Sequence, residues 1–138
     1  MEILDEVSFD VERGKIREFA LATHATDPVH TSIDAAHAAG FPDVPATATH
    51  VVVAGHHRDQ RAFVAKLGLA FDRVVVGSVK WTYLRPLCAG DSLRGVRRVA
   101  SDTRKRELRF VTLETDYLDA SGHCAVRVRE VLIERGAR

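Results

Sequence analysis

The sequence predicts an α+β fold in which an antiparallel sheet wraps around a long central helix. The helix is expected from Thr47 to about Leu67, because apolar residues recur there at helical spacing and Gly68 follows. From residue 72 onwards the pattern changes to β-branched, aromatic and alternating residues, which predicts four long antiparallel strands. A sheet with one apolar face has to be covered, and the long helix is the available cover.

The composition is typical of one globular domain over residues 1–138. Apolar residues make up 46% of the chain, and the formal net charge of +1 lacks the basic excess of a nucleic-acid-binding protein. The acidic start MEILDEVSFD does not resemble an export signal, and the apolar runs are too short to span a membrane. We therefore expect a soluble, cytoplasmic protein with neither nucleic acid nor membrane as a partner. Cys88 and Cys124 are expected to be reduced thiols, and a disulfide between them is the alternative.

One strand and two short helices are expected before the central helix. They are a strand over residues 6–11 and helices over residues 15–23 and 33–39. Pro28 disfavours helical geometry at Asp27, so the backbone has to turn extended between the two helices. Residues 31–34 (TSID) form an N-terminal capping pattern for the second helix, and Gly40 ends it.

Four strands are expected in the second half of the chain. They cover residues 73–85, 92–101, 107–118 and 124–135. The sequence around Pro86 forms the first turn, and residues 119–122 (DASG) form a hairpin turn before the last strand. Gly95 suggests a bulge in the second of these strands.

Candidate chemistry is concentrated in residues 19–49. His30 follows a bend fixed by Pro28, where a loop imidazole can be aimed at a cavity and act as a general acid or base. From the residues alone, a histidine that caps the following helix is the alternative. The histidines and aspartate of residues 56–59 resemble a metal pair, but adjacent residues of a helix face different directions, so no metal site is expected.

Three segments, in this order, resemble one known family. IREFALATHATDPVH (16–30) is similar to the hydratase motif Y-A-x-x-x-G-D-x-N-P-[LIV]-H, and AAGFPDVPATAT (38–49) resembles the turn that follows it. WTYLRPLCAGDSL (81–93) is similar to the strand motif Y-x-R-P-[VL]-x-A-G-D-x-L. The chain thus resembles the MaoC-like (R)-specific enoyl-thioester hydratases and dehydratases, which have the hot-dog fold. The likeness is greatest to the branch with the N-terminal dehydratase domains of fungal-type fatty-acid synthases and the mycobacterial hydroxyacyl dehydratase subunits.

The resemblance implies a site for an α,β-unsaturated thioester of CoA or acyl-carrier protein. In that family an Asp and a His activate water, and a backbone N–H at the start of the central helix binds the thioester oxygen. His30 matches the catalytic His, and the oxyanion position falls near Ala48, so the expected substrate-binding residues are Thr47, Ala48, Thr49 and His50. The CoA or phosphopantetheine arm belongs to the substrate, and no other cofactor is implied. A homodimer is expected, with a heterodimer as the other possibility.

One departure from the family motif affects the chemistry. Ala25 stands where the catalytic Asp is expected, and Asp27 stands where the family usually has Asn. Asp27 is either a displaced catalytic carboxylate or a turn-forming residue. Water is a poor nucleophile and needs deprotonation, whereas a neutral amine can add to the β-carbon with one base to accept its surplus proton. The alternatives are therefore conjugate addition of an amine, a non-catalytic subunit of a heteromeric dehydratase, or, on weaker grounds, a thioesterase.

A basic run offers a further interpretation. Its members lie around one hairpin and are Arg94, Arg97, Arg98, Arg104, Lys105 and Arg106. The run is either a solvated sheet edge or a contact for the phosphates of the CoA or carrier-protein arm.

Overall fold

Five antiparallel strands form one sheet in the computed structural model, which describes residues 2–136. The strands are β1 (Ile3–Asp10), β2 (Val74–Tyr83), β3 (Ser92–Lys105), β4 (Leu108–Leu118) and β5 (Cys124–Glu134). Their order across the sheet is β1-β3-β4-β5-β2, so β1 and β2 form the two edges. The predicted antiparallel α+β architecture is confirmed. β1 begins earlier than expected, and β3 runs on to Lys105.

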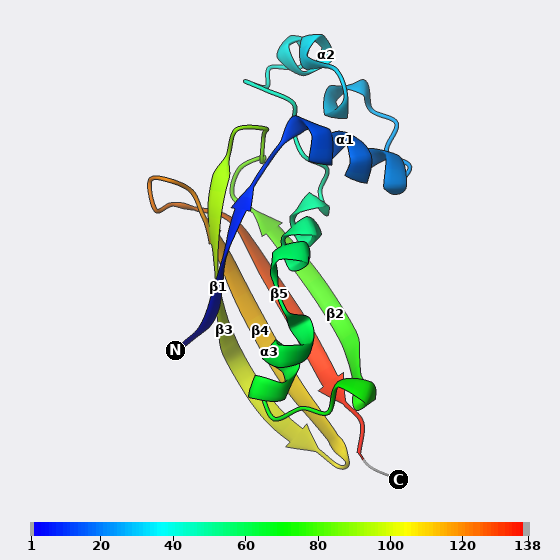
Figure 1. The fold of residues 1–138 in the computed structure, drawn as a ribbon, viewed down its shortest axis with the longest axis vertical. Helices are drawn as coiled ribbons and strands as arrows, with labels where there is room; N and C mark the ends of the chain where they lie inside the picture. The colour runs from blue at the N-terminus through cyan, green and yellow to red at the C-terminus, as the bar shows by residue number, and fades with distance from the viewer. Residues whose placement is uncertain (1, 137–138) are drawn as a thin grey trace.

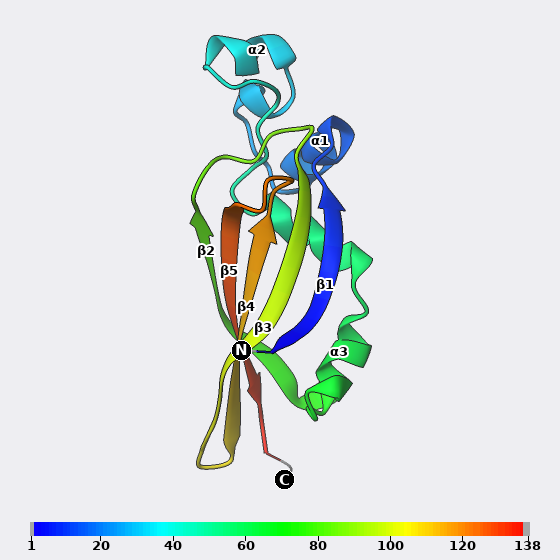
Figure 2. The ribbon, with the colours of Figure 1, turned by 90° about the vertical axis from the view of Figure 1, so that its left-hand side faces the viewer.

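The helical segments occupy two regions (Figures 1 and 2). At one end of the sheet lie α1 (Arg13–Ala22), the 3₁₀ turn η1 (Pro28–His30) and α2 (Ile33–Ala38). The segments η2 (His50–His57) and α3 (Gln60–Lys66) run along one face of the sheet, and η3 (Phe71–Arg73) leads into β2. As expected, Ser32 caps α2 by accepting from the Ala35 N–H at 3.1 Å.

The central helix is not continuous, contrary to the prediction of one helix over residues 47–67. Its first part, η2, is a 3₁₀ helix that begins only at His50, and its second part, α3, is a separate α-helix. Arg58 interrupts them with extended backbone angles (φ −118°, ψ 144°). Asp59 then caps α3, because its Oδ1 accepts from the Ala62 N–H at 3.0 Å.

The break lies over a group of buried polar contacts. The extended backbone turns the Arg58 side chain inward, where its Nη1 donates to Asp5 Oδ1 at 2.9 Å. The same carboxylate accepts two hydrogen bonds from Arg97, which is 3% exposed. These contacts hold the interrupted segment against the sheet, because buried ion pairs are costly to separate.

The core fills the space between the sheet and the two central helical segments. One cluster lies under η2 and includes Phe9, Val51 and Val126, and a second lies under α3 and includes Phe63 and Leu113.

Gly95 does not form the expected bulge. It pairs in regular register with Val7 and Tyr117, and the register of β3 shifts instead between Val99 and Ser101. Glycine is required at position 95 by close packing, because a Cβ there would lie 2.7 Å from the Tyr117 ring and 2.9 Å from Val7.

Both cysteines are free thiols in the structure. Cys88 is buried in the β2–β3 connection, and Cys124 begins β5. Within residues 2–136 no helix combines the length and the apolar character needed to cross a membrane.

Candidate active site

The hydratase-like segment begins where α1 ends in a Schellman motif. The His24 N–H donates to Leu21 O at 3.2 Å, and the Ala25 N–H donates to Ala20 O at 2.8 Å. His24 consequently adopts the left-handed conformation, with φ of +58°, where glycine is preferred. The family motif has Gly at this place, and the left-handed backbone explains why. The His24 side chain is exposed at the helix end, so it belongs to the turn.

Replacing His24 by Gly should raise the free energy of unfolding by about 1 kcal/mol. The gain comes from relief of the left-handed strain, less the extra entropy of glycine in the unfolded chain. Urea denaturation followed by circular dichroism measures it. His56→Gly is the matched control, because exposed His56 has an ordinary negative φ and should lose stability on the same change. A destabilised His24→Gly protein would contradict the expectation.

Asp27 forms the turn that presents His30. Its Oδ1 accepts from the Val29 N–H at 3.1 Å and so caps η1, and the residue is exposed. This contact corresponds to the turn-forming interpretation of Asp27. A direct role of the Asp27 carboxylate in proton transfer stays a prediction.

His30 is half-buried, and a backbone carbonyl orients its ring. The Nδ1 atom lies 2.8 Å from the carbonyl oxygen of Pro45. A carbonyl oxygen only accepts, so Nδ1 carries the proton and the neutral ring keeps its lone pair on Nε2. No hydrogen bond to another group of residues 2–136 occupies that nitrogen. The Pro45 carbonyl thus fixes both the orientation and the tautomer of a potential base, a role that a carboxylate often fulfils.

The start of η2 offers free backbone donors close to the His30 anchor. Within the described part of the chain, the N–H groups of Ala48 and Thr49 donate to no other protein group, and they precede the first residue of η2. Pro45 and Ala48 are three residues apart, a span of at most roughly 11 Å. Amides at a helix start are suited to stabilise negative charge on an oxygen.

Tyr83 of β2 holds this helix start in place. Its hydroxyl donates to the carbonyl oxygen of Ala48. Burial raises the pKa of Tyr83 to about 12, so the phenol stays protonated and remains a donor at neutral pH. The contact fixes the peptide plane between Ala48 and Thr49, and with it the direction of the Thr49 N–H.

His50 lies in the core beside the site. It is 0% exposed, and its ring packs against Phe9 and Phe19 at centroid distances of 5.8 Å and 5.5 Å. Neither ring nitrogen has a partner within residues 2–136, and the buried hydroxyl of Thr47 has none either. Burial, assisted by the charge of Lys15, lowers the pKa of His50 to about 4. Of the expected substrate-binding residues, Ala48 and Thr49 therefore present free amides, while the His50 ring packs in the core.

Folding stability should fall in acid because of His50. Its pKa is about 6.5 in the unfolded chain and about 4 in the folded protein, so the unfolded state binds more protons between these values. The free energy of unfolding should drop by about 3 kcal/mol as pH falls from 6.5 to 4. Urea titrations at several pH values measure it, with His50→Leu as the control that removes this component. Equal pH dependence in both proteins would contradict the assignment.

The cavity beside His30 is small. It measures about 120 Å³ and is lined by Arg13, Arg17, His30, Thr31, Ile33 and Val44. This volume suits a small nucleophile better than a whole thioester. Larger cavities lie along η2 and α3, against the sheet. The cavity at His30 and these larger cavities therefore lie at different places along the molecule.

The basic run of the sequence does not form one surface. Arg97 is buried, while Arg94 pairs with Glu6 and Arg98 with Asp116. Residues 104–106 lie at the β3–β4 turn, at the opposite end of the sheet from η1 and α2 (Figure 1). The arrangement favours the solvated-edge interpretation.

The sequence reasoning missed the groups that orient His30 and fix the central helix. The Pro45 carbonyl is a backbone atom, and nothing in the sequence marks which carbonyl an imidazole will reach. The contacts of Asp5 with Arg58 and Arg97 join residues 53 and 92 positions apart, which local patterns do not reveal. The one available signal was the polar middle of the expected central helix.

Several known proteins are similar to this chain in sequence or in fold. A UPF0336 protein of Leifsonia xyli subsp. xyli is 36% identical over 127 residues, which cover 91% of this chain and 85% of that protein. The C-terminally truncated (3R)-hydroxyacyl-ACP dehydratase complex HadBC of Mycobacterium tuberculosis contains a similar chain, with a TM-score of 0.81, 22% identity and 94% of each chain covered. A MaoC-like dehydratase structure matches with a TM-score of 0.85 and 23% identity, over 99% of this chain and 41% of that one.

These structural similarities establish the hot-dog fold. The family model described as "FAS1-like, dehydratase domain region" matches residues 1–128, which is most of the chain. The protein therefore belongs to the FAS1-like dehydratase-domain family.

Proposed function

We propose that the protein adds a nucleophile to the β-carbon of an α,β-unsaturated thioester of CoA or acyl-carrier protein. The observation that carries the proposal is the hydrogen bond from His30 Nδ1 to the Pro45 carbonyl, which leaves Nε2 as a base. The free amides of Ala48 and Thr49 support it, because they can hold the thioester oxygen as it gains negative charge. The thioester arm belongs to the substrate, and the proposal needs no further cofactor. A cytoplasmic location stays a prediction.

One base is sufficient when the nucleophile is an amine. The amine lone pair attacks the β-carbon, and the π electrons move to the thioester oxygen to give an enolate and an ammonium group. His30 Nε2 takes one ammonium proton and then returns it to the α-carbon. The sum is an amine and an enoyl thioester giving a β-amino thioester, with no change of oxidation state. Ala25 favours this reaction over hydration, because the position of the family's catalytic Asp has no carboxylate here and the Asp27 Oδ1 already accepts from the Val29 N–H.

Incubation of the purified protein with crotonyl-CoA, with and without a panel of amino acids, tests the proposal. Mass spectrometry should detect β-amino adducts that form faster with protein than without it. Formation of the hydrated product alone would overturn the amine reaction and leave ordinary hydration. Absence of either product would favour the second candidate function.

That second candidate is a non-catalytic subunit of a heteromeric dehydratase. Ala25 favours it, because a partner chain would then carry both the Asp and the His. Among the structural neighbours, HadBC and ChsH1–ChsH2 of Mycobacterium tuberculosis are complexes of two different chains. Activity that appears only after addition of a second hot-dog chain would support this function.

We also propose that β2 pairs with a second hot-dog subunit. Its one strand neighbour is β5, so the other edge of β2 is unpaired within the described residues. Val75 and Val76 on β2 are 42% and 57% exposed, and Leu84 just after it is 66% exposed. Unpaired apolar edges favour pairing with another chain. Light scattering of the purified protein should give the mass of two 15.2 kDa chains.

A further inference from the structure

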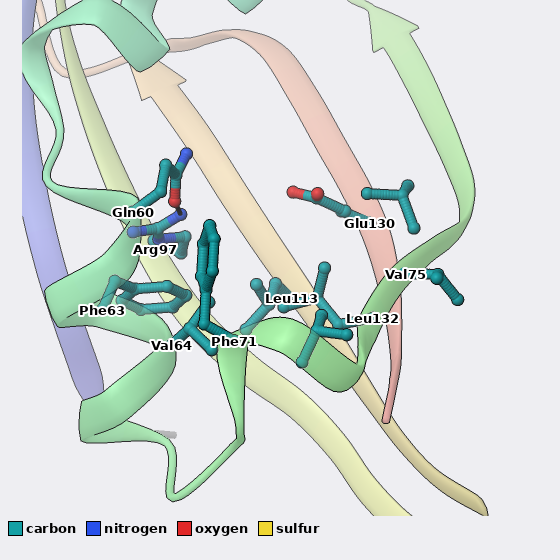
Figure 3. Close-up of a pocket in the computed structure, with 11 residues that line it drawn as sticks. Gln60, Phe63, Val64, Phe71, Val75, Arg97, Leu113, Glu130 and Leu132 are labelled. Carbon is teal, nitrogen blue, oxygen red and sulfur yellow. Dashed lines mark hydrogen bonds between the residues drawn. The ribbon is translucent and has the colours of Figure 1, made fainter. Parts of the chain in front are cut away.

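A groove with a polar centre runs between the central helical segments and the sheet. Its α3 part is a cavity of about 330 Å³ walled by apolar side chains that include Phe63, Phe71 and Leu132 (Figure 3). Its η2 part is a cavity of about 240 Å³ with Trp81 and Val128 in its wall. Both parts share Gln60, Arg97 and Glu130, so the polar centre joins two apolar parts.

Arg97 is held rigidly on one side of the groove. Its Nε and Nη2 donate to Asp5 at 2.9 Å and 2.5 Å, and its guanidinium lies 3.3 Å from the centre of the Phe63 ring. The remaining nitrogen, Nη1, makes only a long contact of 3.4 Å with Gln60 Oε1. That nitrogen can therefore donate to a further group.

Glu130 stands opposite Arg97 without a partner among residues 2–136. Figure 3 shows the carboxyl on the β5 side, turned across the pocket towards Arg97, and no ion pair or hydrogen bond joins the two. Burial raises the pKa of Glu130, although Arg97 and Arg58 oppose the rise. A half-buried carboxyl that faces a cavity and has no partner is costly unless a ligand or water satisfies it.

The space between Arg97 and Glu130 favours a ligand group that can both accept and donate a hydrogen bond. The Arg97 side offers a donor and requires an acceptor, whereas Glu130, at a pH above its raised pKa, offers an acceptor and requires a donor. A hydroxyl group satisfies both, while an ether oxygen satisfies only the arginine and a carboxylate is repelled by Glu130. On both sides of this position the walls are apolar and suit a hydrocarbon chain.

We propose that this groove binds an acyl chain that carries a hydroxyl group, which bridges Arg97 and Glu130. The inference rests on the proposed function, since it assigns the acyl part of the same thioester substrate. The hydroxyl lies far from the reacting carbons. Arg58, at the level of the polar centre, follows the eight-residue helix η2, which is roughly 16 Å long in 3₁₀ geometry.

Binding of short alcohols tests the groove without any thioester chemistry. Trp81 is the single tryptophan of the chain and lines the groove, so its fluorescence reports occupancy. Hexan-1-ol should bind about tenfold more tightly than hexyl methyl ether, because only the alcohol donates to the Glu130 carboxylate. In Glu130→Leu the two probes should bind equally. In Glu130→Gln, which keeps a neutral acceptor, about threefold preference should remain.

Glu114→Gln is the matched control. Glu114 on β4 forms an ion pair of 3.0 Å with Arg129 on β5, and it lies outside both parts of the groove. It should keep the full preference for the alcohol. Equal binding of alcohol and ether to the natural protein, tighter binding of hexanoate, or no binding of any probe would each overturn the proposal. None of these results depends on His30, so they are distinguishable from failure of the proposed reaction.

Discussion

Replacing His30 by Ala should lower the rate of adduct formation from crotonyl-CoA by about 10²–10⁴-fold, the usual contribution of a positioned general base. His30 is the one proposed proton-transfer group whose ring is oriented by a defined contact, and Nε2 is its free nitrogen. The substitution also removes the hydrogen bond to Pro45, which should cost about 1 kcal/mol of stability. Rates under saturating thioester, measured by mass spectrometry, report the loss separately from binding.

The matched control is His37→Ala. Like His30, His37 contacts a proline carbonyl: its Nε2 lies 3.3 Å from Pro42 O. Unlike His30, it is exposed, on α2. It should leave the rate unchanged. If His30→Ala and His37→Ala were equally active, His30 would be a structural residue and the catalytic proposal would be wrong.

Placing Asp at position 25 should raise hydration of crotonyl-CoA by about a hundredfold or more, because it adds the second proton acceptor that water requires. The backbone at residue 25 already forms the hydrogen bond to Ala20 that ends α1, and this contact does not involve the side chain. Ala25→Asp should therefore fold, and the share of amine adduct should fall as hydration competes. Loss of the enoyl absorbance without added amine measures the gain.

Ala25→Asn is the control, because it has nearly the same shape and cannot accept the proton. An equal gain with Asn would show that packing, rather than a base, raises the rate. No gain with Asp, in a protein that folds normally, would favour the non-catalytic subunit. The two variants thus distinguish a catalytic site that lacks the base for hydration from a non-catalytic subunit.

Much of the fold could be predicted because the strands are long and rich in β-branched residues. Turns that depend on Pro28, Ser32 and Gly40 also formed as expected, since each rests on a local backbone requirement. The sequence predicts a central helix that is too long, because its apolar residues continue at helical spacing on both sides of Arg58. The local signals for an interruption are the polar residues 56–60 and the N-cap Asp59, whereas the contact of Arg58 with the distant Asp5 has no local signal.

The candidate site also has parts that the sequence predicts and parts that it does not. His30 and the amides of residues 48 and 49 are expected from the motif resemblance, and their roles stay a prediction; in the structure His30 contacts the Pro45 carbonyl, and the two amides donate to no other group of residues 2–136. His50 was expected to line the pocket, yet it packs between two phenylalanines. Position along a 3₁₀ helix decides which way a side chain points, and the expected α-helical start at Thr47 implied a different direction.

The attachment of β1 has a consequence for the order of folding. β1 pairs with β3, nearly ninety residues later in the chain, and Asp5 on β1 also holds Arg58 and Arg97. Contacts between such distant residues carry a large loop-closure entropy and form slowly. During synthesis β1 therefore has no strand partner until β3 has been made. The contacts of Asp5 that join the central helical segments to the sheet form only once β1 pairs with β3.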